Sequence, residues 1–392
     1  MRSAFPSGRE EKRNALLGAV DSVREIVVAG AAAAEREATL PRETVRALYD
    51  AGLFAIKLPR ELGGAEADPV TQIEVFESIT RLDPSAGWCT MIGCTAIAEP
   101  GAFLPDEAVA QMFPGGRIPL GACTFVPTGR AQAVEGGYRL TGRWPFASGV
   151  RHAEWLAATA FVAREPGSAE ERRVFVLPVS AVKLHDNWQS AGLEGTGSCD
   201  FSCEGLFVAE SFTWHQLQAK PRRGGPLYLM GRPGFVANEC VAFALGVARC
   251  ALDAITAYAR TKKRGLRQQS SVASRAVFQR ALGESELKLA AARALAFEVF
   301  ERAWQTVCRG EPPPPKLQSE MRGVATLATD AAVEVATQAF RYGGGAALYR
   351  TNVLQRCLRD INAAAQHVVV SDVAYENYGK FLLGFPDADP LA

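Results

Sequence analysis

The sequence is poor in histidine, in patterned cysteine and in clustered charge, and each shortage excludes a class of protein. Only four histidines occur among 392 residues, and no two stand at the spacing of metal ligands, so we expect no metal site. The nine cysteines form no CxxC pair, which is typical of reduced thiols in a cytoplasmic protein. The net charge is +1 without a long run of one sign. We therefore expect neither a nucleic-acid nor a membrane partner.

Neither the N-terminus nor the most apolar run of the chain meets the criteria for an export signal or a membrane span. The N-terminus carries charges where a signal peptide has an apolar stretch, so we expect a cytoplasmic protein. The apolar run from Val241 to Ala259 contains Arg249 and Asp253, and these charges interrupt it too often for a bilayer span.

Three compositional zones follow one another and predict three domains, at residues 1–116, 117–228 and 229–392. The first zone has helical patterns, with a helix start at Leu40 to Glu43. The middle zone has short β-favouring runs between glycine-rich turns, which predict an antiparallel β-barrel or sandwich. The runs are 120–126, 138–140, 155–162, 173–177 and 201–208.

The third zone predicts a C-terminal four-helix bundle. Apolar residues recur at steps of three and four in long blocks. The blocks cover about 233–261, 272–308, 317–342 and 348–383, and four prolines separate the second from the third. Helices this rich in alanine usually bury more than one face, so we expect a homo-oligomer, either a homotetramer or a dimer.

The segment from Gln338 to Gly379 carries most of the chemistry. It joins a glycine triplet, a helix rich in Arg and Gln, a run of three alanines and His367. Small residues leave room for a flat ligand, and the Arg and Gln side chains can hold anions. This combination suits a flavin with an acid/base group beside it.

Four segments resemble the acyl-CoA dehydrogenase superfamily, in the order that the superfamily has them. They are DPSAGWCTMIG (83–93), RLTGRWPFASGVRHAEWLAA (139–158), GLEGTGSCDFSCEGLFV (192–208) and QAFRYGGGAALYR followed by LRDINAAAQH (338–367). The resemblance covers about residues 15 to 383. It implies an acyl-CoA dehydrogenase-like fold: an N-terminal helical domain, a central β domain and a C-terminal four-helix bundle, with flavin held between the last two.

One departure from the dehydrogenase pattern points to a different activity. The dehydrogenases usually place a catalytic glutamate after the "RD" motif, whereas this chain has Ala363 to Gln366 and then His367. Glu376 lies about two and a half helical turns further on. A histidine here, together with the serine of FASG, is similar to the two-component flavin-dependent monooxygenases of this fold. That similarity implies a C4a-(hydro)peroxyflavin formed from O2 and reduced flavin, FADH2 or FMNH2, which a separate NAD(P)H:flavin reductase supplies.

The resemblance assigns roles to several residues, and each has a structural alternative. His367 and Ser148 would be catalytic, on opposite edges of the flavin; a polar helix residue and a turn serine are the alternatives. Trp144 would pack against the flavin or in the β-domain core. Trp88, Met91 and Phe125 would line the pocket of a small organic substrate, aromatic or amine-bearing, or they would be ordinary core residues. Further flavin contacts would come from Thr124, Lys263, Arg264, Arg267, Gln338, Gly343, Gly344 and Gly345.

Two other functions remain open at this point. The chain could be an FAD-dependent acyl-CoA dehydrogenase with an unrecognised base, or a scaffold that binds flavin or another ligand without catalysis. Basic residues from Lys262 to Arg267 would contact the flavin phosphate, or they would be solvated residues at a helix C-terminus. The glycine triplet would let phosphates approach the backbone, or it would form a helix-to-helix turn.

Overall fold

The computed structural model describes residues 5–162, 171–264 and 270–391. The chain forms two compact units. The first, the sheet unit, comprises Met1–Ala67, Trp88–Gln189 and Glu194–Tyr228; the second, the helical unit, comprises Asp68–Gly87, Ser190–Leu193 and Leu229–Ala392. The first two predicted domains contribute most of the sheet unit, and the third contributes most of the helical unit.

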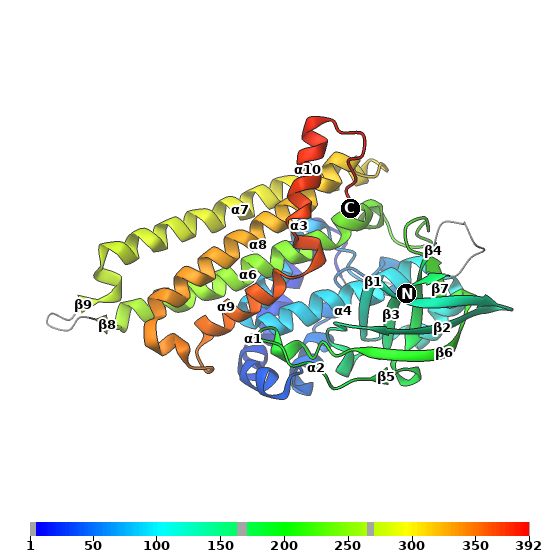
Figure 1. The fold of residues 1–392 in the computed structure, drawn as a ribbon, viewed down its shortest axis with the longest axis horizontal. Coiled ribbons are helices and arrows are strands. Elements are labelled where there is room, and N and C mark those ends of the chain that lie inside the picture. Colours follow the sequence, from blue (N-terminus) through cyan, green and yellow to red (C-terminus); the bar gives the residue numbers. More distant parts are fainter. Residues whose placement is uncertain (1–4, 163–170, 265–269, 392) are drawn as a thin grey trace. The chain divides into compact units, whose positions relative to one another are not determined.

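A seven-stranded sheet organises the sheet unit (Figure 1). All five predicted β-favouring runs coincide with its strands, except that Leu120 precedes the first strand. In chain order the strands are β1 (Gly121–Val134), β2 (Gly137–Trp144), β3 (Trp155–Val162), β4 (Glu171–Pro178), β5 (Lys183–Leu184), β6 (Phe201–Ala209) and β7 (Thr213–His215). Their order across the sheet is β5-β6-β2-β1-β3-β4-β7.

The sheet is mixed, which corrects the antiparallel arrangement expected from the sequence. β1 pairs with β2 as an antiparallel hairpin at Gly136, but β1 pairs with β3 in parallel. The reason is the connection from Pro145 to Glu154, which carries the chain from one side of β1 to the other. We call this connection the crossover loop, and it contains Ser148.

Helices cover one face of this sheet. The sheet unit contains α1 (Arg9–Glu37), α2 (Arg42–Asp50), most of α4 (Pro84–Phe103) and α5 (Asp106–Met112). Buried side chains of α4 and α5, such as Ala96 and Met112, pack with Cys123 and Val176 of the strands. A second apolar cluster around Trp144 and Phe201 fills the other face.

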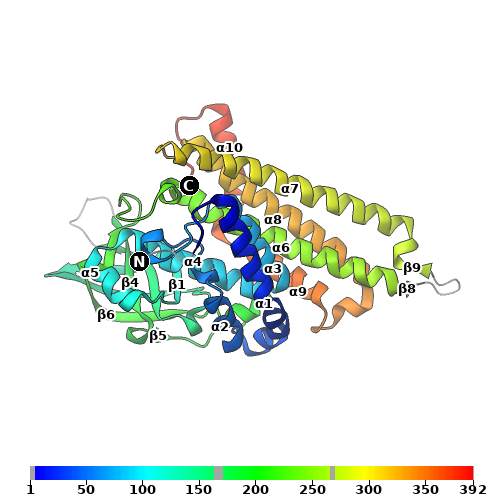
Figure 2. The same cartoon turned by 180° about the vertical axis from the view of Figure 1, so that it is seen from behind.

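Three long helices run side by side in the helical unit (Figures 1 and 2). They are α6 (Gly231–Thr261), α7 (Ala276–Cys308) and α8 (Pro315–Gly343), and α3 (Pro69–Leu82) packs against α6. A two-strand hairpin of β8 (Lys263–Arg264) and β9 (Ser270–Ser271) follows α6. Three of the four predicted helical blocks are confirmed.

The fourth block differs from the prediction, because it is two helices. α9 (Val353–Ala364) and α10 (Val373–Leu383) are separated by a turn and a short 3-10 helix at Val368–Val370. His367 stands at the start of this interruption. The alanine run favours helix locally, but three consecutive valines follow it and lower helix propensity.

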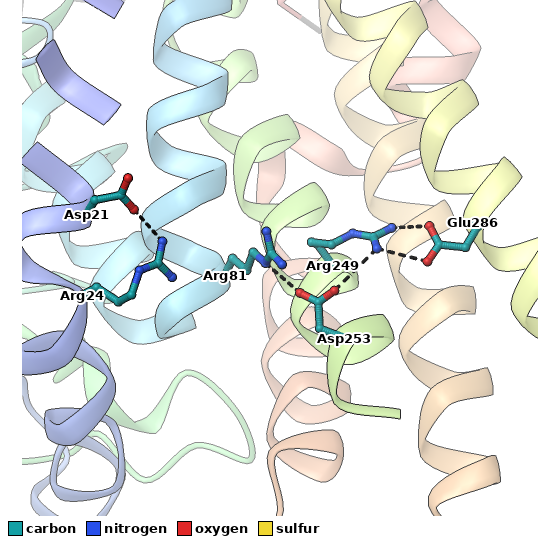
Figure 3. Close-up of polar contacts among 6 residues, drawn as sticks. All are labelled: Asp21, Arg24, Arg81, Arg249, Asp253 and Glu286. Carbon is teal, nitrogen blue, oxygen red and sulfur yellow. Dashed lines mark hydrogen bonds and ion pairs between the residues drawn. The ribbon is translucent and has the colours of Figure 1, made fainter. Parts of the chain in front are cut away.

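Ion pairs join three helices of the helical unit (Figure 3). Arg81 of α3 contacts Asp253 of α6 at 2.7 Å, and Arg249 of α6 lies 3.6 Å from the same carboxylate. Arg249 also forms a two-bond contact with Glu286 of α7. The contact with Glu286 raises the pKa of Arg249 above its ordinary value. The pair Asp21–Arg24 on α1, in the same figure, is a separate surface contact of the sheet unit.

Contrary to the expectation from Arg249 and Asp253, helix α6 is, within the described part of the chain, the one helix long and apolar enough to cross a membrane by length and composition. Its most apolar window has a mean hydropathy of 1.7, and 67% of that window is buried in the structure. A core helix of a bundle meets the same criterion, and burial of this extent is what the packing of α6 against α3, α7 and α8 produces.

Candidate functional site

The crossover loop is fastened to the segment that precedes β6. The Ala147 N–H donates to the carbonyl of Cys199 at 3.2 Å, and the Gly149 N–H donates to the carbonyl of Thr196 at 2.9 Å. Gly149 has φ +76°, a left-handed conformation that glycine adopts without strain. These bonds fix the backbone on both sides of Ser148.

A chain of hydrogen bonds holds the Ser148 hydroxyl. The indole Nε1–H of Trp88, on α4, donates to Ser148 Oγ at 3.0 Å. Ser148 Oγ lies 2.7 Å from Ser198 Oγ, and Ser198 Oγ lies 2.6 Å from Thr196 Oγ1. All four side chains are buried. The prediction for Trp88 named a substrate pocket; the contact that the structure shows is with the predicted catalytic serine.

Thr124, on β1 beside Ala158 of β3, supplies an unsatisfied hydroxyl. Its Oγ1 is buried and has no hydrogen-bond partner among the described residues. The pairing of β1 with β3 is irregular between Thr124 and Gly129, and Thr128 Oγ1 donates to the carbonyl of Arg143 at the end of β2. A buried hydroxyl without a partner is costly unless a ligand completes it. Thr124 therefore fits the predicted flavin contact.

Phe146 is a residue of this region that sequence reasoning did not identify. It has φ +64°, which is unusual for a bulky residue, and 68% of it is exposed. Its ring meets Trp188 edge to face, at 6.3 Å between centroids. Strained backbone and an exposed aromatic ring two residues before Ser148 are typical of a functional position. The sequence carries no signal of the strain, because the left-handed residue is not a glycine.

The other predicted side chains of the sheet unit lie in its core. Trp144 is fully buried, stacks on Phe201 at 5.2 Å and donates its indole N–H to the carbonyl of Thr159 at 2.7 Å. Of the two positions that the sequence allows for Trp144, the structure shows the core. Met91 is also fully buried, and Phe125 is half-buried beside the apolar cluster under α4 and α5.

His367, in the helical unit, stands where α9 has ended. Its backbone N–H donates to Ala364, and its Nδ1 accepts a long bond of 3.4 Å from the N–H of Val369. Arg322 of α8 holds the residues that follow, because its guanidinium donates to the carbonyls of Val368 and Val369 at 3.0 and 3.1 Å. Burial lowers the pKa of Arg322. Arg322 positions this turn, and no sequence motif indicated it.

The protonation of His367 differs from the sequence-based expectation. An imidazole that titrates near neutral pH was expected, but burial lowers the pKa of His367 to about 4. The ring is therefore neutral at pH 7. Because Nδ1 accepts from a backbone N–H, the ring proton belongs on Nε2. His367 presents a neutral N–H donor rather than a positive charge.

The three glycines of the triplet have different structural roles. A Cβ on Gly343 would lie 2.7 Å from Leu354 Cδ1, so this glycine is needed for packing between α8 and α9. Gly344 has φ 60° and ψ −151°, a conformation available essentially only to glycine, and it ends α8. A Cβ on Gly345 would meet nothing within 4 Å. Gly345 is thus the member of the triplet whose backbone a ligand can approach freely.

The remaining predicted flavin contacts are spread along α6 to α8. Gln338 lies in a groove of about 330 Å³ between α7 and α8, where Lys288 pairs with Glu334 and Arg280 pairs with Glu284. Because these cations are already paired, the groove has no excess positive charge for an anion. Lys263 is exposed in the β8–β9 hairpin, Arg264 belongs to the same hairpin, and Arg267 lies outside the described residues.

Glu376, the nearest carboxylate after the "RD" motif, lies on α10. Its side chain is exposed and pairs with Lys380 at 3.5 Å. An exposed, paired carboxylate on a separate helix has none of the desolvation expected of a catalytic base. The structure thus offers no support for Glu376 as the base of a dehydrogenase.

Comparison with known proteins defines the class of this fold. The acyl-CoA dehydrogenase N-terminal domain matches residues 10–103, and the acyl-CoA dehydrogenase C-terminal domain matches residues 240–372. XiaF from Streptomyces sp., solved in complex with FADH2 and glycerol, has a TM-score of 0.89, with 24% identity and 98% of each chain covered. The chain belongs to the acyl-CoA dehydrogenase family.

Two curated relatives identify the group within the family. The indole-3-acetate monooxygenase of Pseudomonas putida is 30% identical over 350 residues, which are 89% of each chain. The "Flavin-dependent monooxygenase, oxygenase subunit HsaA" of Mycobacterium tuberculosis is 25% identical and covers 98% of this chain and 99% of its own. This protein is accordingly a flavin-dependent monooxygenase, an oxidoreductase that uses reduced flavin and O2.

Proposed function

We propose that this protein is the oxygenase component of a two-component system and that it inserts one oxygen atom into a small aromatic substrate. The name of the mycobacterial relative, an oxygenase subunit, supports a separate reductase as partner. The name of the Pseudomonas relative supports an aromatic substrate. Reduced flavin, when bound, reacts with O2 and supplies the transferred oxygen atom, so the protein contributes positioning and exclusion of water.

The observation that carries the proposal is the pair of buried hydroxyls in the sheet unit. Thr124 Oγ1 lacks a partner among the residues that the structure describes, and Ser148 Oγ is fixed by Trp88 and Ser198. Both suit the polar edge of a flavin ring, where hydrogen bonds fix orientation. Thr124 would hold the ring, and Ser148 would contact N5.

His367 would act on flavin or on the substrate through Nε2–H. A neutral donor can hydrogen-bond to an oxygen atom without placing a cation in an apolar site. Arg322 would keep the imidazole in place by holding the carbonyls of Val368 and Val369. For the flavin phosphate, Gly345 is the contact best supported by the structure, and Lys263, Arg264, Arg267 and Gln338 remain predictions.

Phe146 would contact the aromatic substrate. Its exposed ring and strained backbone are stable only if packing or a ligand compensates them. Aromatic pairs contribute about 0.5–1.5 kcal/mol beyond their burial. Phe146→Ala should therefore weaken binding of indole-3-acetate by about threefold to tenfold, whereas Phe207→Ala, which removes another exposed ring of the sheet unit, should leave it unchanged.

Coupling of flavin oxidation to product formation tests the proposal. A flavin reductase with NADH would supply reduced flavin, and product and hydrogen peroxide would be measured with indole-3-acetate and phenol as substrates. Ser148→Ala and His367→Ala should each lower the product fraction by about threefold to tenfold and raise hydrogen peroxide. Ser202→Ala and His185→Ala, which break one side-chain contact elsewhere, are matched controls. Wild-type coupling in both site variants would remove these roles, and release of peroxide alone by the wild type would contradict the aromatic substrate.

A further inference from the structure

Trp88, Ser148, Ser198 and Thr196 form one line of hydrogen bonds, which we call the hydroxyl chain. Its distances are 3.0, 2.7 and 2.6 Å, and every member is buried. The first bond has a fixed direction, because an indole N–H only donates. The other two are bonds between hydroxyls, in which either oxygen can donate.

A count of donors and acceptors shows that the chain has two states. Ser148 Oγ has one proton and two lone pairs, and the indole of Trp88 occupies one lone pair. If Ser148 donates to Ser198, its second lone pair is free to accept a bond from a ligand. If Ser198 donates to Ser148 instead, the Ser148 proton is free to be donated to a ligand. Reversing the two hydroxyl bonds thus changes Ser148 from an acceptor to a donor.

Flavin N5 makes the opposite change during each reaction cycle. In reduced flavin N5 carries a proton and donates, and in oxidised flavin N5 has a lone pair and accepts. We propose that Ser198 and Thr196 are positioning residues that let the Ser148 hydroxyl reverse, so that it accepts from N5–H of reduced flavin and donates to N5 of oxidised flavin. No covalent bond is made or broken in this step, since the hydroxyl protons only rotate from one hydrogen-bond partner to another.

This inference rests on the proposed contact between Ser148 and flavin, and it predicts an asymmetric effect. In Ser198→Ala, Ser148 can still donate to oxidised flavin and loses only a second acceptor bond. With reduced flavin, however, both Ser148 lone pairs are used, and its proton has no acceptor left. A buried donor without an acceptor is the costlier loss. Ser198→Ala should therefore weaken binding of reduced flavin by about tenfold more than binding of oxidised flavin.

Thr196→Val extends the test with a side chain of the same shape. It keeps the one methyl group of threonine and replaces with a second methyl the hydroxyl that accepts from Ser198 when Ser148 donates to Ser198. The change in the ratio of affinities should have the same sign as in Ser198→Ala. Ser198→Thr keeps a hydroxyl at the central position and should restore the wild-type ratio.

The measurement uses anaerobic titration of the intact chain with FAD and FMN, each oxidised and reduced, together with the midpoint potential of bound flavin. A tenfold selective loss of reduced flavin makes the two-electron potential about 30 mV more negative. Far-UV circular dichroism reports whether each variant is folded, and Ser202→Ala on β6 is the control.

The outcomes separate this inference from the proposed function. A selective loss of reduced flavin in Ser198→Ala and Thr196→Val supports the reversible hydroxyl chain. If Ser148→Ala weakens flavin binding but the other two variants keep the wild-type ratio, the reversal is wrong and the Ser148 contact stands. If Ser148→Ala leaves both affinities unchanged, Ser148 does not contact flavin, and the inference fails with that assignment.

Discussion

His152, in the crossover loop, should make the sheet unit sensitive to mild acid. Its ring packs against Gly149, where a Cβ would lie 2.9 Å from Nε2, and it lies 6.4 Å from the ring of Phe54. Its Nδ1 is buried and has no hydrogen-bond partner within the described ranges. Burial lowers the pKa of His152 to about 4. The imidazole is therefore neutral in the folded chain at neutral pH.

The sign of the effect follows from proton binding. The unfolded chain has an ordinary histidine pKa of about 6.5, so between pH 6.5 and 4 it binds a proton that the folded chain does not. Stability from this group is complete above pH 6.5 and is lost as the pH falls towards 4. The free energy of unfolding falls by about 3 kcal/mol in total, and about 2 kcal/mol of this fall has already occurred at pH 5.

Denaturation of wild type and His152→Asn at pH 7.5 and pH 5.0 measures this loss. Tryptophan fluorescence reports mainly on the sheet unit, which holds five of the six tryptophans, the exception being Trp304. The variant should lose about 2 kcal/mol less than wild type between the two pH values. Any cost of the buried amide occurs at both pH values and cancels. His215→Asn, elsewhere in the same unit, is the control.

A parallel pH dependence in wild type and His152→Asn would refute this reasoning. It would mean that the imidazole is solvated or finds a partner in the folded protein, so that its pKa is close to that of the unfolded chain. His367 titrates over the same window, but it is present in both proteins compared, so its contribution cancels.

Three further predictions concern packing and the flavin contacts. Gly343→Ala should destabilise the helical unit, because its Cβ overlaps Leu354, whereas Gly345→Ala should leave the melting temperature unchanged and weaken flavin binding if the backbone there contacts phosphate. Trp144→Phe should lower the free energy of unfolding in denaturant by about 1–3 kcal/mol, because the carbonyl of Thr159 loses its donor. It should leave the affinity for flavin unchanged. A loss of flavin affinity without a loss of stability would contradict the core position of Trp144. Arg322→Met should increase hydrogen exchange at residues 367–371, and unchanged exchange would show that Arg322 does not hold this turn.

Element types and order were predictable from the sequence, because they depend on local pattern. Runs of β-favouring residues between glycine-rich turns identified the main strands, and one such turn, at Gly136, joins β1 to β2. Which strands pair with each other was not predictable from these local patterns. Nothing in the pattern of β3 says that it pairs with β1 in parallel, because that pairing is decided by where the crossover loop takes the chain.

The candidate site was predictable only in part, for reasons of the same kind. Ser148 and His367 follow from motif resemblance, but their neighbours are distant in sequence: Trp88 is 60 residues from Ser148, and Arg322 is 46 residues from Val368. The low pKa of His367 depends on burial, which an alanine-rich helix pattern does not reveal. The break between α9 and α10 likewise depends on a distant residue, because Arg322 of α8 donates hydrogen bonds to the carbonyls of Val368 and Val369.

The mixed sheet and the placement of Ser148 have one physical cause. Because β3 lies beside β1 on the side away from β2, the crossover loop has to cross β1. The pairing of β1 with β3 is irregular between Thr124 and Gly129, and Thr124 is left without a hydrogen-bond partner among the described residues. The loop forms one short 3-10 helix, at Val150–His152, and its backbone also bonds to the carbonyls of Thr196 and Cys199. Those bonds bring Ser148 within 2.7 Å of Ser198. Lengthening the loop after Gly149 by two glycines should therefore loosen the hydroxyl chain and lower flavin affinity while the strands persist, and unchanged affinity would show that Ser148 is placed by α4 alone.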